Sequence, residues 1–131
     1  MRLAIRLAVC VAALWAAGAQ ARDVRQRQLL VDLAGVLGES HALRQACAGA
    51  DDQFWRARML RLLEVERAPV PLEGELKAAF NDGYMARRRD FPTCTPLARQ
   101  AEAAAAARGR GLARRLSQSV GEPAPDSVAP P

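Results

Sequence analysis

One short segment of the chain has the residue types of a nucleophilic site. Gly38-Glu39-Ser40-His41-Ala42 is similar to the elbow on which many hydrolases expose a nucleophilic serine. That elbow needs a turn from a strand into a helix, whereas this segment lies inside a predicted helix, with Ser40 on its apolar face and His41 about 100° away. We therefore predict no catalytic residue here. We expect His41 to be a structural polar residue, hydrogen-bonded to a neighbouring helix or to solvent, or else a ligand-binding one.

The chain offers little material for a metal site, since it has one His and three Cys. His41 and Cys47 are about 120° apart on one helix and diverge. A metal site needs several converging ligands. The sequence predicts neither a metal nor a cofactor.

Arg44 shares a predicted helix face with Leu33, Leu37 and Ser40. A charge on such a face must be paired or must reach out to water. We favour a structural ion pair over a ligand-binding cation. The candidate partners are Glu64, Glu66 and Asp82.

Arg87, Arg88 and Arg89 form a short basic run at the end of a predicted helix. The run could bind an acidic protein, an anionic lipid head group or a polyanion of the cell envelope. The alternative is a solvated helix end, because cations there complement the helix dipole.

The composition favours one small domain. The 131 residues are 50% apolar and 25% charged, with a net charge of +5. This apolar content argues against a wholly disordered chain. Without residues 1–21, which carry Arg2 and Arg6, the net charge is 17 minus 14, or +3. That charge is too small to be typical of nucleic-acid binding, so we predict no nucleic-acid partner.

The N-terminus has the pattern of a signal peptide. Arg2 and Arg6 precede an unbroken apolar run from Leu7 to Ala17, and Ala19-Gln20-Ala21 is typical of a cleavage site. The run is shorter than the roughly 20 residues that cross a bilayer. We therefore predict a signal peptide over residues 1–21, a periplasmic mature protein, and contact with the membrane only during export. A lipoprotein signal at Cys10 is the weaker alternative.

Two cysteines, Cys47 and Cys94, remain after that cleavage. In an oxidising compartment a pair of cysteines predicts a disulfide, although two reduced buried thiols are the alternative. The enclosed loop of roughly fifty residues would contribute about 4 kcal/mol by restricting the unfolded chain.

The remaining chain predicts an all-α fold. Apolar residues recur at the helical period, and we expect a small four-helix bundle-like domain over residues 22–116. Thr95 and Pro96 are typical of a helix start, whereas Gly83 lies inside a predicted helix, which close approach of another helix would explain. We expect Phe54 and Trp55 in the core, although exposed anchors for a partner are the alternative. We also expect a disordered Pro-rich tail over residues 117–131. The expected helices cover residues 24–47, 51–66, 72–89 and 96–116.

A resemblance to a known family rests on several of these segments together. They are the segment of residues 33–47, Gln53-Phe54-Trp55-Arg56, Ala79-Phe80-Asn81-Asp82-Gly83-Tyr84 and Thr93-Cys94-Thr95-Pro96. Together they resemble a family of short exported proteins of alpha-proteobacteria that is classed as a conserved domain of unknown function. The resemblance covers residues 25–116 and adds Tyr84 to the residues of interest, as a structural polar or ligand-binding residue beside His41 and Arg44. It implies export, paired cysteines and helices, and no mechanism.

Three functions remain open from the sequence. The leading hypothesis is a non-enzymatic periplasmic helical module that binds another protein or a component of the envelope. The second is a small stress-type holdase chaperone. The third is a small envelope hydrolase that uses Glu or Asp together with His41.

Overall fold

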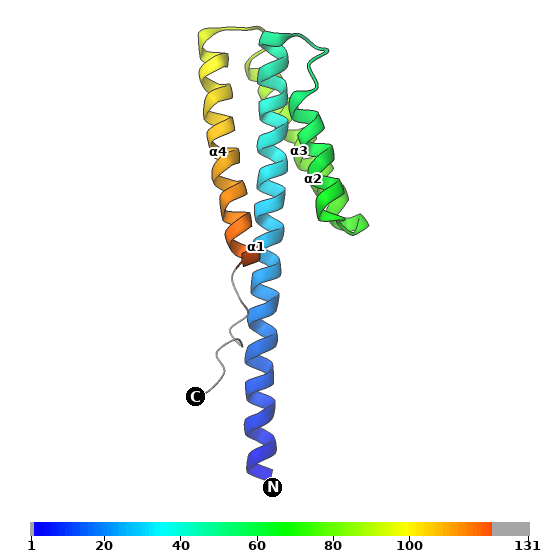
Figure 1. The fold of residues 1–131 in the computed structure, drawn as a ribbon, viewed down its shortest axis with the longest axis vertical. Helices are drawn as coiled ribbons and strands as arrows, with labels where there is room; N and C mark the ends of the chain where they lie inside the picture. The colour runs from blue at the N-terminus through cyan, green and yellow to red at the C-terminus, as the bar shows by residue number, and fades with distance from the viewer. Residues whose placement is uncertain (1, 122–131) are drawn as a thin grey trace.

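The computed structural model describes the backbone of residues 2–121 and the side chains of residues 23–120. Over this range the fold is all-α, with four helices and no strand, as the sequence predicts. The helices are α1 (Arg2–Ala48), α2 (Phe54–Glu66), α3 (Val70–Asp90) and α4 (Pro96–Gly121). Figure 1 shows α1 as the central helix, with the other three helices arranged around its C-terminal half.

Helix α1 begins much earlier than residue 24, where the sequence analysis placed its start. It continues without a break from Arg2 to Ala48. The reason is local, because the segment before residue 24 is rich in Ala and Leu, which favour a helix, and has no proline to interrupt it. The N-terminal half of α1 extends beyond the ends of the other helices (Figure 1). The signal peptide over residues 1–21 stays a prediction. Among the residues searched, no helix combines the length and apolarity needed to cross a membrane.

The boundary between α2 and α3 also differs from the prediction. Helix α2 begins at Phe54, and it ends when Arg67 adopts the left-handed conformation, with φ of 45°, and donates its N–H to the carbonyl of Leu63. Helix α3 begins at Val70, two residues before its predicted start, so that Pro71 lies in its first turn. A proline fits there because the first helical residues have no intrahelical acceptor for their N–H groups.

Helix α4 starts as predicted and ends later. The hydroxyl of Thr95 accepts the N–H of Ala98 at 3.0 Å, as expected of a capping residue. The helix then continues to Gly121, so the predicted disordered tail is wrong for residues 117–121. Ser117 and Ser119 fit into the helix by donating their hydroxyls to the carbonyls of Arg114 and Leu116. The remainder of the predicted tail, residues 122–131, lies outside the described residues.

The core has two parts because α1 uses two of its faces. On one face Leu30, Ala34 and Leu37 pack with Met59 of α2 and Leu76 of α3. On the other face Val36 and Leu43 pack with three residues of α4, which are Ala98, Ala105 and Leu112. Over residues 2–121, α4 packs on α1 alone. The bundle is therefore open between α2 and α4.

Helices α1 and α3 cross with their backbones in contact. A Cβ atom at Gly38 would lie 1.9 Å from the carbonyl oxygen of Phe80, and one at Gly83 would lie 2.2 Å from that of Gly35. At both positions a Cβ atom would overlap the backbone of the other helix, so that only glycine fits. The reason suggested for Gly83 by the sequence, close approach of another helix, is confirmed.

The predicted disulfide is present. Cys47 near the end of α1 is bonded to Cys94, which lies just before α4. Within residues 2–121 α4 contacts only α1, and it buries mostly alanines, which contribute little apolar area. This bond is therefore a main constraint on the position of the first turn of α4.

Candidate functional site

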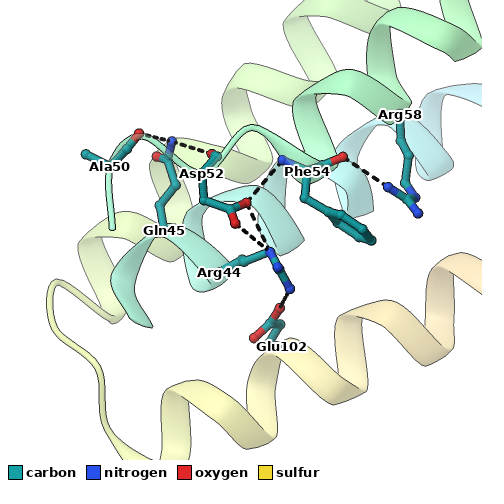
Figure 2. A network of polar contacts seen from close by, with 7 residues as sticks. All are labelled: Arg44, Gln45, Ala50, Asp52, Phe54, Arg58 and Glu102. Atoms are coloured by element: carbon teal, nitrogen blue, oxygen red, sulfur yellow. Dashed lines mark hydrogen bonds and ion pairs between the residues drawn. The ribbon is translucent and has the colours of Figure 1, made fainter. Parts of the chain in front are cut away.

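Arg44 holds the loop between α1 and α2 in place. Its Nε lies 3.0 Å from both carboxylate oxygens of Asp52, and its Nη1 lies 3.9 Å from the carboxylate of Glu102 on α4 (Figure 2). The three expected partners, Glu64, Glu66 and Asp82, are wrong. The loop after Gly49 folds back over the end of α1 and brings Asp52 to Arg44, which helical periodicity alone does not predict.

Asp52 joins this contact to the start of α2. Its Oδ1 accepts the N–H of Phe54 at 3.1 Å, while Gln45 donates from Nε2 to the carbonyls of Ala50 and Asp52 (Figure 2). The hydrogen bond from Phe54, followed by those from Arg44, lowers the pKa of Asp52 below its usual value. The loop is therefore fixed by two side chains of α1, Arg44 and Gln45, and by the first backbone N–H of α2.

Phe54 lies between two arginines rather than in the core. The guanidinium of Arg58 is 3.5 Å from the centre of its ring, and that of Arg44 is 4.6 Å away. Phe54 is 39% exposed, so the core position expected for it is wrong. Trp55 packs edge-on against Phe54 and contacts the buried cluster of Met59 and its neighbours. Arg58 also donates from Nη1 to the carbonyl of Phe54 at 3.2 Å, so stacking and this hydrogen bond hold its guanidinium against the start of α2.

An apolar groove of about 390 Å³ opens between α2 and α4, with α1 as its floor. We call it the α2–α4 groove. Leu33, Val36 and Leu37 form the floor, whereas α4 contributes small residues such as Ala106 and Gly109. The uncharged polar residue of the lining is Ser40, whose hydroxyl is buried and has no hydrogen-bond partner among the described residues. The groove exists because α2 and α4 both pack on α1 and not on each other.

Three exposed arginines line the α2–α4 groove, and no carboxylate does. They are Arg58 and Arg61 of α2 and Arg110 of α4. Arg61 forms an exposed pair with Glu64, which lies outside the lining, at 2.8 Å, and pairs of this kind contribute little and exchange partners readily. The surface thus combines an apolar floor with positively charged edges.

A second cavity, of about 590 Å³, lies between α1, α2 and α3. We call it the His41 pocket. His41 is 5% exposed and lies between the rings of Phe80 and Tyr84, with ring centres 5.7 and 5.4 Å away. Its Nδ1 has no hydrogen-bond partner among the described residues. A hydrogen bond from His41 to solvent therefore stays a prediction. Burial, followed by the charge of Arg56, lowers the pKa of His41 below its usual 6.5.

Tyr84 connects the His41 pocket to the Arg44 loop. Its hydroxyl donates to Gln45 Oε1 at 2.9 Å and accepts a hydrogen bond from Arg88 at 3.0 Å. His41 and Tyr84 therefore line one cavity, whereas Arg44 acts on the loop beside it.

The three arginines of the basic run, residues 87–89, lie in different surroundings in the structure. Arg87 pairs with Glu39 of α1 at 2.8 Å, and Arg108 of α4 reaches the same carboxylate at 2.6 Å. The carboxylate raises the pKa of Arg87 above its usual value. Arg88 belongs to the His41 pocket, and Arg89 is exposed. The three arginines thus do not form one patch.

Two arrangements considered in the sequence, a pairing of Ser40 with His41 and a metal-binding cluster, are not formed among residues 23–120. Ser40 and His41 make no hydrogen bond with each other, and the lining of the His41 pocket includes no carboxylate. No three His, Cys, Asp or Glu side chains in this range come together in a way that could hold a metal ion. The α2–α4 groove and the His41 pocket are places where another molecule could bind.

Sequence reasoning missed the α2–α4 groove. A signal for it was present, because Arg58 falls within the apolar face of α2, and α4 carries a run of alanines from Ala103 to Ala107 where a core helix would carry larger side chains. The small side chains of α4 do not reach α2, and Arg58 interrupts the apolar face of α2. The apolar surface between the two helices therefore stays uncovered.

Comparison with known proteins identifies one family. A family model described as a protein of unknown function, DUF2385, matches residues 26–120. No curated protein and no solved structure matches the chain. The match covers nearly the same stretch as the resemblance noted in the sequence, and it confirms that the family is a domain of unknown function.

Proposed function

The chain belongs to the DUF2385 family, and we propose that it is a non-enzymatic periplasmic module that binds an amphipathic helix of a partner protein in the α2–α4 groove. The observation that carries this proposal is the lining of the groove, which is apolar in the middle and edged by Arg58, Arg61 and Arg110. Exposed apolar surface with a charged edge is typical of protein interaction sites.

The dimensions of the α2–α4 groove suit a helix. Its lining extends from Trp55 to Val65 on α2 and from Ala105 to Ala113 on α4, which corresponds to about 12–15 Å along each helix axis. That length accommodates two to three turns of a docked helix, with apolar side chains at positions i, i+4 and i+7 facing the floor. The small residues of α4 let a third helix approach closely.

The charges favour a partner with acidic side chains on either side of its apolar face. Opposite charges at the edge of an interface select partners and speed association. A second copy of this chain fits less well, because a symmetric contact places the same surface against itself and would bring arginines against arginines. A small ligand also fits less well, because such sites combine an apolar lining with several converging polar groups.

The N-terminal sequence and the disulfide support the periplasmic part of the proposal. The N-terminal pattern of Arg2, Arg6, the apolar run and Ala19-Gln20-Ala21 is that of a signal peptide. The bond between Cys47 and Cys94 suits an oxidising compartment. Both features favour a protein that acts outside the cytosol, as is implied by the resemblance to exported alpha-proteobacterial proteins.

A designed peptide tests binding in the groove. The acid-flanked peptide has about twelve residues, with leucines at i, i+4 and i+7 and glutamates on both sides of that face; the lysine-flanked peptide has lysines in place of the glutamates. The full chain with Trp15→Phe keeps Trp55, a groove residue, as its one tryptophan. We expect saturable quenching or enhancement of Trp55 fluorescence by the acid-flanked peptide, and binding of the lysine-flanked peptide at least about tenfold weaker.

Charge reversal at one arginine supplies the matched control. Arg110→Glu removes a groove cation and should weaken binding of the acid-flanked peptide and strengthen that of the lysine-flanked one. Arg99→Glu makes the same change at an exposed position of α4 outside the groove and should leave the ratio between the two peptides unchanged. If Arg110→Glu and Arg99→Glu change the ratio of the affinities for the two peptides equally, the groove has no specific role in binding. A variant that ends at Gly121 shows whether residues 122–131 compete with the peptide.

A further inference from the structure

The His41 pocket is separate from the α2–α4 groove. Helix α2 presents Arg56, Met59 and Leu63 to the pocket and Trp55, Arg58 and Leu62 to the groove, and the two sites share no lining residue. We propose that the His41 pocket binds a small organic anion with an apolar body. This proposal does not depend on the function proposed for the groove.

The charge of the pocket favours an anion. Three cations line it, namely Arg56 of α2 and Lys77 and Arg88 of α3, and its lining includes no carboxylate. Lys77 is already hydrogen-bonded to Glu73. Arg56 and Arg88 make no ion pair within the described residues, and Arg88 donates to the hydroxyl of Tyr84. Two guanidinium groups, which bind carboxylate and phosphate oxygens well, are therefore available to a ligand.

The rest of the lining favours a ligand that is more than a bare anion. Met59, Leu63 and Phe80 give the pocket an apolar wall, and Asn81 and Gln53 add amide groups. The volume of about 590 Å³ falls within the range of small-molecule sites. An inorganic anion would leave the apolar wall in contact with water, whereas a short alkyl or aromatic body would cover it.

The buried side chain of His41 also points to a ligand, independently of the charge of the pocket. It is a polar side chain that is 95% buried, lines the pocket, and has an Nδ1 atom without a partner among the described residues. Buried polar atoms without partners are costly and uncommon in folded proteins. The charged groups that act on it are Arg56, which disfavours its protonation, and Asp52, which favours it. An imidazole of low pKa stays neutral at neutral pH, so the arginines provide the charge that attracts the anion.

The uniqueness of this histidine makes the proposal easy to test. The chain has one His, so the imidazole proton signals of the full chain without an affinity tag report on the pocket alone. The probe is octanoate, which carries one carboxylate and a short apolar body. We expect saturable shifts of the His41 signals and a higher pKa of His41 in the complex, because a carboxylate near an imidazole favours its charged form.

Three other small molecules test separately the need for an apolar body, for a negative charge and for a particular head group. Acetate has the charge without the body, octylamine has the body with the opposite charge, and octyl phosphate shows whether the pocket prefers a phosphate head group. We expect acetate and octylamine to produce no saturable shift at concentrations where octanoate saturates. At least one of octanoate and octyl phosphate must bind.

Substitutions outside the pocket provide matched controls. Arg56→Gln and Arg88→Gln should each weaken binding by at least about tenfold, as expected for the loss of a charged hydrogen bond. Arg61→Gln on α2 and Arg89→Gln on α3 are exposed and outside the pocket, and they should leave the affinity unchanged. Circular dichroism confirms that each variant is folded. The proposal is overturned if neither octanoate nor octyl phosphate gives a saturable shift, if acetate binds as well as octanoate, or if Arg56→Gln and Arg88→Gln bind as tightly as the controls.

Discussion

Gly83 of α3 lies so close to Gly35 of α1 that a Cβ atom at position 83 would come within 2.2 Å of the Gly35 carbonyl oxygen. The obstacle is backbone rather than a flexible side chain, so it cannot move aside. This contact sets the distance between α1 and α3, the two helices that form one side of the His41 pocket.

Replacing Gly83 by alanine should therefore destabilise the protein. We expect Gly83→Ala to lower the free energy of unfolding by about 1–3 kcal/mol, because the helices must separate. Gly74→Ala is the control, since Gly74 lies in α3 with nothing within 4 Å of its added Cβ. That substitution should raise the free energy of unfolding by up to about 1 kcal/mol through helix propensity. Urea denaturation followed by circular dichroism compares them, and equal stabilities would contradict a backbone contact.

The disulfide should stabilise α4 more than the rest of the fold. The bond joins residues that are 47 positions apart and so restricts the unfolded chain. Its removal by Cys47→Ala and Cys94→Ala should lower the free energy of unfolding by about 4 kcal/mol. Hydrogen exchange should rise first in α4, because α4 packs on α1 alone over the described residues. Cys10→Ala is the control and should change neither quantity. Unchanged protection of α4 in the double variant would contradict this assignment.

Asp52 should matter for the start of α2. Asp52→Ala removes the acceptor of the Phe54 N–H and the partner of Arg44, and should lower the midpoint of thermal unfolding. Asp52→Asn keeps a side-chain oxygen for Phe54 and should lower it less. Asp51→Ala, at an exposed neighbouring position, should have little effect. A midpoint for Asp52→Ala equal to that of Asp51→Ala would show that the network in Figure 2 does not stabilise the loop.

The buried imidazole of His41 predicts a dependence of stability on pH. The pKa of His41 is lower in the folded protein than its usual 6.5, mainly because of burial. The unfolded chain therefore takes up a proton before the folded chain does, as the pH falls below about 6.5. His41 therefore leaves the free energy of unfolding unchanged above that pH and lowers it below that pH, by at most about 1.4 kcal/mol per pH unit.

Urea denaturation at several pH values between 8 and 5 measures this slope, and His41→Gln should abolish it in this window. The depressed pKa of Asp52 acts at lower pH, since its usual value is 3.8, and it also decreases stability as the pH falls. The two effects are therefore separable. An unchanged slope in the His41→Gln variant would show that another group is responsible.

Local features of the fold could be predicted from the sequence because each depends on a few neighbouring residues. Thr95 as a cap and Gly83 at a close contact follow from residue type and position. The bond between Cys47 and Cys94 follows from the number of cysteines and the expected compartment. The start of α1 and the end of α4 could not, because nothing in the sequence forces a helix of favourable residues to begin or stop at the expected domain boundary.

The candidate sites were harder to predict because they depend on how the helices pack. The α2–α4 groove requires α2 and α4 to pack on α1 without touching each other, and the pairing of Arg44 with Asp52 requires a loop that folds back. Periodicity indicates which face of a helix is apolar. It does not indicate whether another helix of the same chain covers that face.

A substitution inside the groove should separate binding from folding. Ala106 lines the α2–α4 groove, whereas Ala107 is exposed and outside it. Ala106→Glu places a charge on the apolar lining and should reduce binding of the acid-flanked peptide by at least about tenfold. Ala107→Glu should bind as the unchanged chain does, and thermal unfolding should show both variants folded.

The most direct measurement of the central proposal is a map of the peptide on the protein. Backbone amide signals of the full chain, labelled with nitrogen-15, are recorded as the acid-flanked peptide is added. The account predicts shifts concentrated on the groove residues of α2 and α4, such as Arg58, Leu62, Ala106 and Arg110, with little change at His41 and Tyr84. Shifts that map outside the groove, or no saturable shift up to about 1 mM peptide, would contradict it.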